Sequence, residues 1–399
     1  MKRPLLISLC FLIVTVGLSH LAIGTAFSLD TNYCQYLQGV LFSRGVIHGD
    51  ATHFKGLSVH LTCMFDPFQT GYASKYPPGY SALIAMALPL RATTLINPIC
   101  GAMTLLLTLL IVQRGYRDSG IFFWTVVLSF ASIYFLHMSA ESWNHPSALL
   151  ACTVIVWAAL QEPTRSRSSS LFIVLALIFC ALTRPLSAVG MALFLLVVAL
   201  QRRWNTSPDI VSSTRLITSA TIGIVAGGVA LGLYNHVLTG DFFTSGYEAM
   251  HGPPHNPGFH IDPYGRDFTL WAALMDLGSR WRSMNEWLFM WPIPSLTLLA
   301  IWAVVYKRWS RCDATLLLWI GAQSLIYCLM WSAGQVQFGP RFLYEALPAC
   351  IILSARGMTT IEEMLGGTTK VRLLLLVSVG GLSTVGFIRY VEWLARFSS

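Results

Sequence analysis

A succession of apolar segments, running from one end of the chain to the other, is the feature that most constrains its fold. Hydrophobic residues make up 55% of the 399 residues and charged residues 11%, whereas a soluble protein carries about 25% charged residues. A backbone surrounded by lipid must satisfy its own hydrogen bonds, which a helix does within one segment. The sequence therefore predicts an all-α polytopic membrane protein, folded as a single domain over residues 1–399.

The first predicted segment covers residues 4–26 and follows Met1-Lys2-Arg3. This start would also suit a signal peptide, but ~24 apolar residues can cross a bilayer, so an uncleaved helix is preferred. Segment 79–91 is too short for a simple crossing, and is either re-entrant or a short helix that turns at Arg91. The further predicted segments are 95–113, 120–137, 146–160, 171–183, 186–200, 216–238, 287–305, 314–333, 342–355 and 371–389.

Basic residues cluster in loops between these segments, and the clusters set the predicted orientation. If segment 79–91 does not cross completely, the clusters fall on one side, which the positive-inside rule places in the cytoplasm. If it does cross, the orientation of every later segment inverts and the basic clusters lie outside. Short clusters at helix ends are typical of a membrane protein and argue against a nucleic-acid partner, despite a net charge of +8. The clusters contain Arg114, Arg117, Arg165, Arg167, Arg202, Arg203, Arg215, Lys307, Arg308, Arg311, Arg356, Lys370 and Arg372.

Two long polar intervals, 28–78 and 239–286, then lie on the outer side. The inner loops are short, and this asymmetry favours a functional site on the outer face. Residues 270–277, within the second interval, are predicted to form a short interfacial helix. Cys34 and Cys63 both lie in the first interval, and they can pair if it faces an oxidising compartment.

Asp30 and Lys75 are the two candidates in the first interval. Asp30 lies a few residues beyond the first segment, where a carboxylate beside a cavity can keep a raised pKa and act as a general base. The alternative is a helix cap or a plain loop charge. Lys75 precedes Tyr-Pro-Pro-Gly at the entry to segment 79–91. Its ammonium can reach a lipid phosphate there, or simply extend to the membrane interface.

Arg184 and Arg341 are the candidates elsewhere. Arg184 interrupts a long apolar stretch at Thr183-Arg184-Pro185, where the proline and the charge predict a break. A charge at a helix centre costs about 2.5–3.5 kcal/mol on the insertion scale, so such a residue usually faces a cavity or a partner. Arg341 and Glu345 are four residues apart at a helix start, so they can pair with each other, or Arg341 can bind an anion.

Other polar residues have a weaker case. Glu141 and His145 share an outer loop and are either solvated or part of a site. His251, His255 and His260 lie in a loop rich in Gly and Pro, where surface histidines are more common than ligands, so no metal is predicted. Walker A, GxGxxG, GxSxG and HExxH motifs are absent, which disfavours an ATP-driven pump and a soluble-type hydrolase.

The polar motifs also occur in a recognisable order. They are Asp30, Lys75-Tyr76-Pro77-Pro78-Gly79-Tyr80, Thr183-Arg184-Pro185, Leu-Tyr-Asn-His-Val-Leu-Thr-Gly-Asp-Phe-Phe (233–243) and Gly-Pro-Arg-Phe-Leu-Tyr-Glu-Ala-Leu-Pro (339–348). This order resembles the GT-C glycosyltransferases, the superfamily of the protein O-mannosyltransferases and aminoarabinose transferases. More closely, it resembles their bacterial dolichyl-phosphate-mannose-transferase-like and RgtA/B/C/D-like members, over nearly the whole chain.

The resemblance implies roles for individual residues. In the superfamily the first outer loop usually carries two adjacent acids; Asp30 matches the first, while Thr31 stands in place of the second. This departure weakens any mechanism with paired carboxylates and any case for a metal. Lys75 is placed like a lysine that lies near the lipid phosphate in the aminoarabinose transferases. The other candidates for substrate or phosphate binding are Arg184, Arg341, Tyr344, Glu141 and His145.

The resemblance also implies a fold and an activity. We expect a GT-C-type bundle of about 10–12 transmembrane helices with short periplasmic helices, in a bacterial inner membrane and without a separate C-terminal soluble domain. The implied reaction is an inverting transfer, without metal or cofactor, of a sugar from a polyprenyl-phosphate donor to a glycan, lipid or protein acceptor. A transporter or flippase of an amphipathic or lipid-linked solute is the alternative. A catalytically inactive scaffold is a third hypothesis, because of Thr31.

Overall fold

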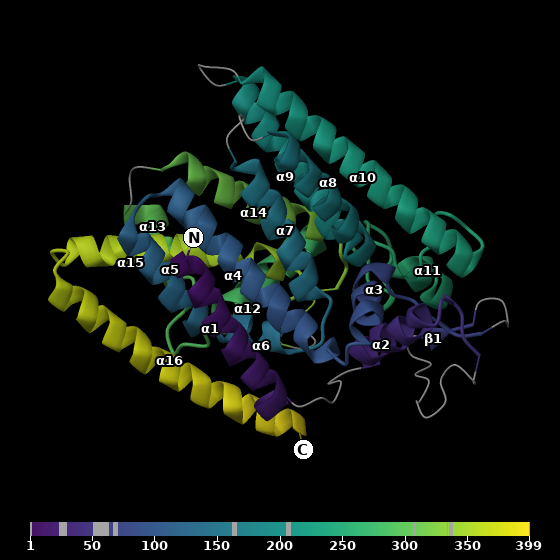
Figure 1. Ribbon diagram of the computed structural model, residues 1–399, viewed down its shortest axis with the longest axis horizontal. Helices are drawn as coiled ribbons and strands as arrows, with labels where there is room; N and C mark the ends of the chain where they lie inside the picture. The colour runs from purple at the N-terminus through teal and green to yellow at the C-terminus, as the bar shows by residue number, and fades with distance from the viewer. Residues whose placement is uncertain are drawn as a thin grey trace.

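The protein is a bundle of helices (Figure 1). The computed structural model describes residues 2–23, 30–50, 64–66, 71–161, 166–204, 209–305, 309–332, 334 and 338–398. The α-helices are α1 (Lys2–Leu18), α2 (Asp30–Ser43), α3 (Pro78–Ala87), α4 (Ile96–Gly115), α5 (Ser119–Ala131), α6 (Ile133–Ala140), α7 (His145–Ala159), α8 (Ser166–Thr183), α9 (Pro185–Trp204), α10 (Ile210–Thr239), α11 (Gly246–His251), α12 (Leu270–Trp287), α13 (Thr297–Val305), α14 (Arg311–Tyr327), α15 (Leu347–Met364) and α16 (Thr369–Ser398).

Short elements complete the fold. A π-helical turn, η1 (Ser19–Ile23), extends α1, and 3₁₀ turns form η3 (Thr93–Leu95), η5 (Pro253–His255) and η6 (Tyr344–Ala346). Strands β1 (Met64–Phe65) and β2 (Ala73–Ser74) pair antiparallel, with Met64 opposite Ser74. The prediction of an almost wholly helical fold is therefore confirmed for the described residues.

Within the described residues, five helical stretches are long and apolar enough to cross a membrane, and a sixth results if the bent pair α5–α6 counts as one span. The helices α7 and α8 contribute shorter apolar stretches, His145–Ala159 and Ser168–Thr183. By length and composition this is a membrane protein. The five stretches are Lys2–Leu21, Thr93–Gly115, Pro185–Trp204, Ile210–Thr239 and Thr369–Arg396.

Two predicted segments are each divided in two. Segment 287–305 contains Pro292 and Pro294, which lack an N–H and disfavour a helical residue before them, so α12 ends at Trp287 and α13 begins at Thr297. The interfacial helix expected at 270–277 instead extends to the end of α12.

Segment 120–137 breaks at Ser132, between α5 and α6, which meet at 59°. The Ser132 hydroxyl accepts a hydrogen bond from the Phe135 N–H at 3.2 Å and donates to the Leu288 carbonyl at 2.7 Å. The side chain thus caps α6 and ties the break to a neighbouring segment. The helix α15 likewise starts later than the predicted 342, at Leu347, with Pro348 in its first turn.

The short segment 79–91 is a helix that turns before the next one. The helix α3 has 10 residues, and Arg91 in the following turn has φ 52°, a left-handed conformation. This agrees with the second of the two alternatives predicted for the segment. The break at Thr183-Arg184-Pro185 is also confirmed, because α8 ends at Thr183 and α9 begins at Pro185.

The bundle has two distinguishable ends. The helices α7 and α9 begin at one end, where α14 finishes, and we call this the loop end because α2, α3 and α11 gather there (Figure 1). At the opposite end α4, α7 and α9 finish and α14 begins. The 20 residues of α9 span about 30 Å at 1.5 Å per residue, which matches the hydrocarbon core of a bilayer.

Candidate functional site

Four polar residues from separate elements meet at the loop end; we call them the Arg184 cluster (His145, Arg184, Tyr327 and Glu345). The Arg184 Nε lies 2.6 Å from the Glu345 carboxylate, in a pair whose side chains are 11% and 0% exposed. The His145 Nδ1 lies 3.4 Å from the same carboxylate oxygen. Arg184 therefore faces a partner, one of the two environments expected for a charge inside an apolar stretch. Glu345 and Arg341 can pair by their spacing, but among the described residues the Glu345 carboxylate forms its ion pair with Arg184 and also contacts His145.

Hydrogen bonds fix the orientation of this cluster. Arg184 donates to the Tyr327 hydroxyl from Nη2 at 2.8 Å and from Nε at 3.1 Å. The Ser187 hydroxyl lies 2.7 Å from the same oxygen. The Arg184 Nη1 lies 3.1 Å from the His145 Nε2, and arginine has only donors. The His145 ring is therefore neutral, with Nε2 accepting and the proton on Nδ1 directed to Glu345.

Three guanidinium groups surround the ring of Phe342. The carbon atoms of Arg184, Arg280 and Arg341 lie 5.6, 5.3 and 5.4 Å from its centroid. Tyr327 stacks on the same ring with centroids 5.0 Å apart. Cations over an aromatic face are attracted by the ring quadrupole. The Phe342 ring therefore offsets part of the electrostatic repulsion among the three guanidinium groups.

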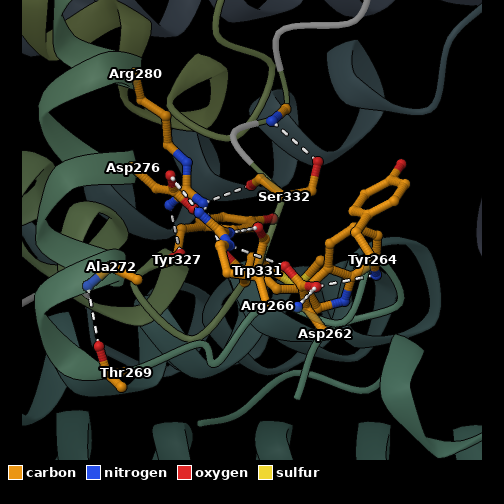
Figure 2. Close-up of polar contacts among 12 residues, drawn as sticks. Asp262, Tyr264, Arg266, Thr269, Ala272, Asp276, Arg280, Tyr327, Trp331 and Ser332 are labelled. Carbon is orange, nitrogen blue, oxygen red and sulfur yellow. Dashed lines mark hydrogen bonds and ion pairs between the residues drawn. The ribbon is translucent and has the colours of Figure 1, made fainter. Parts of the chain in front are cut away.

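Arg280 has a structural role within this group, as Figure 2 shows. It is 0% exposed and donates to the backbone carbonyls of Met330 and Ser332 at 2.7 and 2.6 Å. Arg266 holds the same segment by donating to the Trp331 carbonyl at 2.8 Å. Together they fix the turn that follows α14, and hence the position of Tyr327 at its end.

Lys75 belongs to a second group at the loop end, with Tyr76, Tyr247 and His251. Its Nζ lies 2.8 Å from the His251 Nε2, 5.1 Å from the Tyr247 ring centroid and 5.6 Å from that of Tyr76. Burial, with the Lys75 charge, lowers the pKa of His251 to about 4. The imidazole is therefore neutral at pH 7, and it accepts a hydrogen bond from the Lys75 ammonium.

Tyr247 links the two groups. Burial raises the pKa of its hydroxyl, while Arg341 and Arg184 act in the opposite direction, so both cations lie within electrostatic range of it. Its ring also contacts Tyr76 with centroids 5.3 Å apart. Lys75 lies over the Tyr247 ring, while Arg184 and Arg341 share the Phe342 ring, so three basic residues that are far apart in the sequence come together at the loop end.

Two glycines allow the turn that contains Lys75 to pack closely against its neighbours. A Cβ on Gly79 would lie 2.9 Å from the Leu182 carbonyl oxygen, and a Cβ on Gly246 would lie 2.7 Å from the Lys75 carbonyl oxygen. Backbone contacts this close exclude any larger residue. The Lys75-Tyr-Pro-Pro-Gly turn therefore packs against the end of α8 on one side and the start of α11 on the other.

Asp30 is the first residue of α2, and its side chain lies outside the described part. Further along the helix, Asn32 and Gln35 are each 1% exposed, and their amide groups have no hydrogen-bond partner among the described residues. Buried amides normally find partners, so this face of α2 is suited to a polar ligand. Cys34 is disulfide-bonded; its predicted partner Cys63 lies outside the described residues.

Glu141 and Tyr344 are placed differently from the basic residues. The Glu141 carboxylate lies 2.9 Å from the His137 Nε2, and that ring contacts the Tyr390 hydroxyl through Nδ1 at 2.9 Å. Glu141 therefore belongs to a neighbouring buried group rather than to the Arg184 cluster. The Tyr344 ring packs between Tyr134 and His145, with centroids 5.2 and 6.3 Å away.

The histidines of the second long interval do not assemble as one set. The rings of His251 and His255 stack with centroids 4.6 Å apart. The nitrogens of His260 instead lie 2.8 and 2.7 Å from the Ile261 and Asn256 carbonyls. In the part of the chain that the structure describes, no group of three or more His, Cys, Asp or Glu residues could hold a metal ion.

Several residues of this site carry no distinctive sequence pattern. Tyr327 is an ordinary aromatic at the end of an apolar helix, and Tyr247 and Asn32 lie in polar intervals with many similar residues. Only the packing of distant segments reveals them.

Comparison with known proteins adds no relative: no protein-family model, curated protein or solved structure matches the chain. What the site can do follows from its chemistry. It gathers several cations and tyrosine hydroxyls at one end of a membrane bundle, an arrangement suited to binding a phosphate group.

Proposed function

We propose that the protein is a GT-C-type membrane glycosyltransferase that transfers a sugar from a polyprenyl-phosphate donor to a glycan, lipid or protein acceptor. The observation that carries the proposal is the meeting of three basic residues at the loop end, where α2 begins with Asp30: Lys75 contacts Tyr247 and His251, and Arg184 and Arg341 share the Phe342 ring. Cations held by buried partners are pre-organised, so they can stabilise an anion without rearranging.

The proposed reaction is a direct displacement at the anomeric carbon. The bond from this carbon to the phosphate oxygen breaks, and polyprenyl phosphate leaves with the electron pair. Its growing negative charge is stabilised by Lys75, Arg184 and Arg341. The acceptor oxygen forms the new bond from the opposite side, and its proton passes to Asp30 as general base. This route inverts the anomeric configuration and uses neither metal nor cofactor.

The distribution of charge supports an extracytoplasmic site. The end of the bundle opposite the Arg184 cluster carries Arg114, Arg117, Arg202, Arg203 and Arg311. By the positive-inside rule that end faces the cytoplasm. The loop end then faces the periplasm of a bacterial inner membrane, with α2 and α3 as juxtamembrane helices of a bundle of about 10–12 crossings.

Asp30→Asn tests the base. Loss of general-base catalysis lowers a rate by about 10²–10⁴-fold, so we expect at least a 100-fold slower transfer with donor binding and folding unchanged. Asp50→Asn, which removes an exposed carboxylate from the same interval, is the matched control. Near-normal transfer by the Asp30→Asn protein would show that another group takes the proton.

Lys75→Met tests the phosphate contact. A hydrogen bond to a charged group contributes about 1.5–3 kcal/mol, so we expect at least tenfold weaker binding of polyprenyl phosphate, measured by native mass spectrometry. Lys370→Met removes an exposed lysine at the other end of the bundle and should bind normally. Equal affinities for both variants would refute the role of Lys75.

The buried pair of Arg184 and Glu345 also suits a transporter, since charged residues inside membrane bundles often line solute pathways. The two functions differ in product. A glycosyltransferase consumes polyprenyl-phosphate sugar in detergent without a gradient and forms a covalent product. A transporter moves its solute into sealed vesicles and leaves it chemically unchanged.

A further inference from the structure

A cavity of about 850 Å³ lies at the end of the bundle opposite the Arg184 cluster. It is formed where α4, α7 and α9 finish and α14 begins. Its volume falls within the range of small-molecule sites, about 300–1,000 Å³. Four arginines line it, namely Arg114, Arg117, Arg202 and Arg311.

The cavity is separate from the candidate glycosyl-transfer site. Arg184 immediately precedes α9, and Arg202 lies in the last turn of the same helix. Eighteen residues of helix place them about 27 Å apart along its axis. A ligand in the cavity is therefore not the sugar bound at the loop end.

The cavity arginines lack carboxylate partners among the described residues. None of the four forms an ion pair with a carboxylate in the described ranges of the chain. Asp313, the nearest acid in sequence to Arg311, is already bound by Arg356 at 3.1 Å and by the Tyr116 hydroxyl at 2.7 Å. The cavity thus concentrates positive charge, which favours an anionic ligand.

One of the arginines is fixed in place. Arg202 donates to the Ser212 hydroxyl at 2.6 Å and to the Ala159 carbonyl at 2.5 Å, which joins α9 to α7 and α10. Arg114 is hydrogen-bonded to the Gln161 side chain. Guanidinium groups held in this way match the geometry of phosphate oxygens better than flexible ammonium groups do.

The remaining lining indicates where the ligand comes from. Ile111, Leu160 and Val198 give the cavity an apolar wall, and Trp204 at the end of α9 is 77% exposed. Exposed tryptophans at helix ends are typical of the headgroup level of a membrane, and basic sites between membrane helices hold anionic lipid headgroups. We propose that this arginine cavity binds the phosphate group of an anionic phospholipid from the adjacent leaflet.

The test measures binding of phosphatidylglycerol to purified, delipidated full-length protein by native mass spectrometry. Phosphatidylcholine is the zwitterionic comparison, and inorganic phosphate is titrated separately because it offers the same oxygens without a lipid. The variant is Arg117→Gln/Arg311→Gln. Both residues are exposed and make no side-chain hydrogen bond within the described parts of the chain, so folding should not suffer. Arg203→Gln/Lys370→Gln is the matched control, because it removes two exposed charges at the same end outside the cavity.

We expect saturable binding of phosphatidylglycerol that is about 30-fold weaker in the cavity variant, because the variant lacks two basic residues near the anionic headgroup. Binding to the control variant should be unchanged. Tight binding of inorganic phosphate without saturable lipid binding would overturn the lipid source and support a soluble phosphate ligand. Equal losses in the two variants, or equal binding of phosphatidylcholine, would overturn the site.

Discussion

Breaking the pair of Arg184 and Glu345 should destabilise the protein more than replacing both residues. The two side chains are 11% and 0% exposed, and Nε and Oε1 are 2.6 Å apart. Removing one member of a buried pair costs about 3–5 kcal/mol because the other charge stays buried without its partner. Replacing both with apolar residues of similar volume is often neutral or stabilising. We therefore expect the Arg184→Met/Glu345→Met protein to be more stable than either single variant.

The two single variants should differ in a way that the contacts explain. After Glu345→Gln, Arg184 still donates to the Tyr327 hydroxyl at 2.8 and 3.1 Å. The unfolding free energy should therefore fall by about 3 kcal/mol, the lower end of the cost of breaking a buried ion pair. After Arg184→Met, the Glu345 carboxylate loses its ion pair and keeps only the contact with the neutral His145 ring at 3.4 Å among the side chains described near it. At neutral pH the Arg184→Met protein should therefore lose more unfolding free energy than the Glu345→Gln protein.

The pH dependence of stability gives an independent readout. Glu345 lies in η6, outside the stretches long enough to span a membrane. Burial alone would raise its pKa, but Arg184 and His145 hold the pKa below its ordinary value. The pair's contribution is therefore complete above the unfolded-state pKa of about 4.3 and is lost as the pH falls below it. In Arg184→Met, burial raises this pKa, so stability should instead increase as the pH falls toward 5.

The measurement is equilibrium unfolding in mixed micelles, followed by circular dichroism at a series of pH values. Arg282→Gln is the control, because the Arg282–Glu286 pair is 3.4 Å apart with side chains 83% and 57% exposed. An exposed pair of this kind contributes at most about 1 kcal/mol. The reasoning is refuted if Glu345→Gln is as mild as the control, or if the double variant loses the sum of the two single losses.

Two further predictions concern the loop end and the packing of the bundle. Because the pKa of His251 is lowered to about 4, the unfolded chain binds more protons between that pH and about 6.5, and stability falls as the pH falls through this window; His251→Gln should show a shallower acid loss by the same unfolding measurement. A Cβ on Gly357 would overlap the Leu298 carbonyl oxygen, whereas one on Gly380 meets nothing within 4 Å. Gly357→Ala should therefore lower the unfolding free energy by at least about 1–3 kcal/mol, and Gly380→Ala should raise it by about 0.5–1 kcal/mol; similar values for both would contradict the close contact of α13 and α15.

The helices and some of their breaks could be predicted from local patterns in the sequence. Apolar runs predicted most helices, and the proline after Arg184 predicted the break between α8 and α9. The prolines at 292 and 294 carried the same signal within segment 287–305, but its strong hydrophobicity outweighed them in the prediction. The break at Ser132 has a weaker local signal, because a single serine inside an apolar run begins a helix only when its neighbours allow it.

The partners of the charged residues could not be predicted in this way. Spacing of four residues allows Glu345 to pair with Arg341, since such neighbours meet on one helix face, and it leaves open whether Arg341 binds an anion instead. The backbone there is a turn and a short 3₁₀ element rather than an α-helix, so Glu345 faces Arg184 instead. The contact of Lys75 with His251 joins positions 176 residues apart, and only the tertiary fold determines it.

Stability alone does not account for the Arg184 cluster. The bundle already has an extensive apolar core, and a buried ion pair is rarely more stable than hydrophobic residues of the same size. The protein nevertheless surrounds Arg184 with Glu345, Tyr327 and His145, each of which fixes its position. A costly charge that is held this firmly is typical of a functional site inside a membrane protein. In the proposed enzyme, that function is to keep a guanidinium in place before the donor phosphate arrives, so that no rearrangement is needed when the glycosidic phosphate bond breaks.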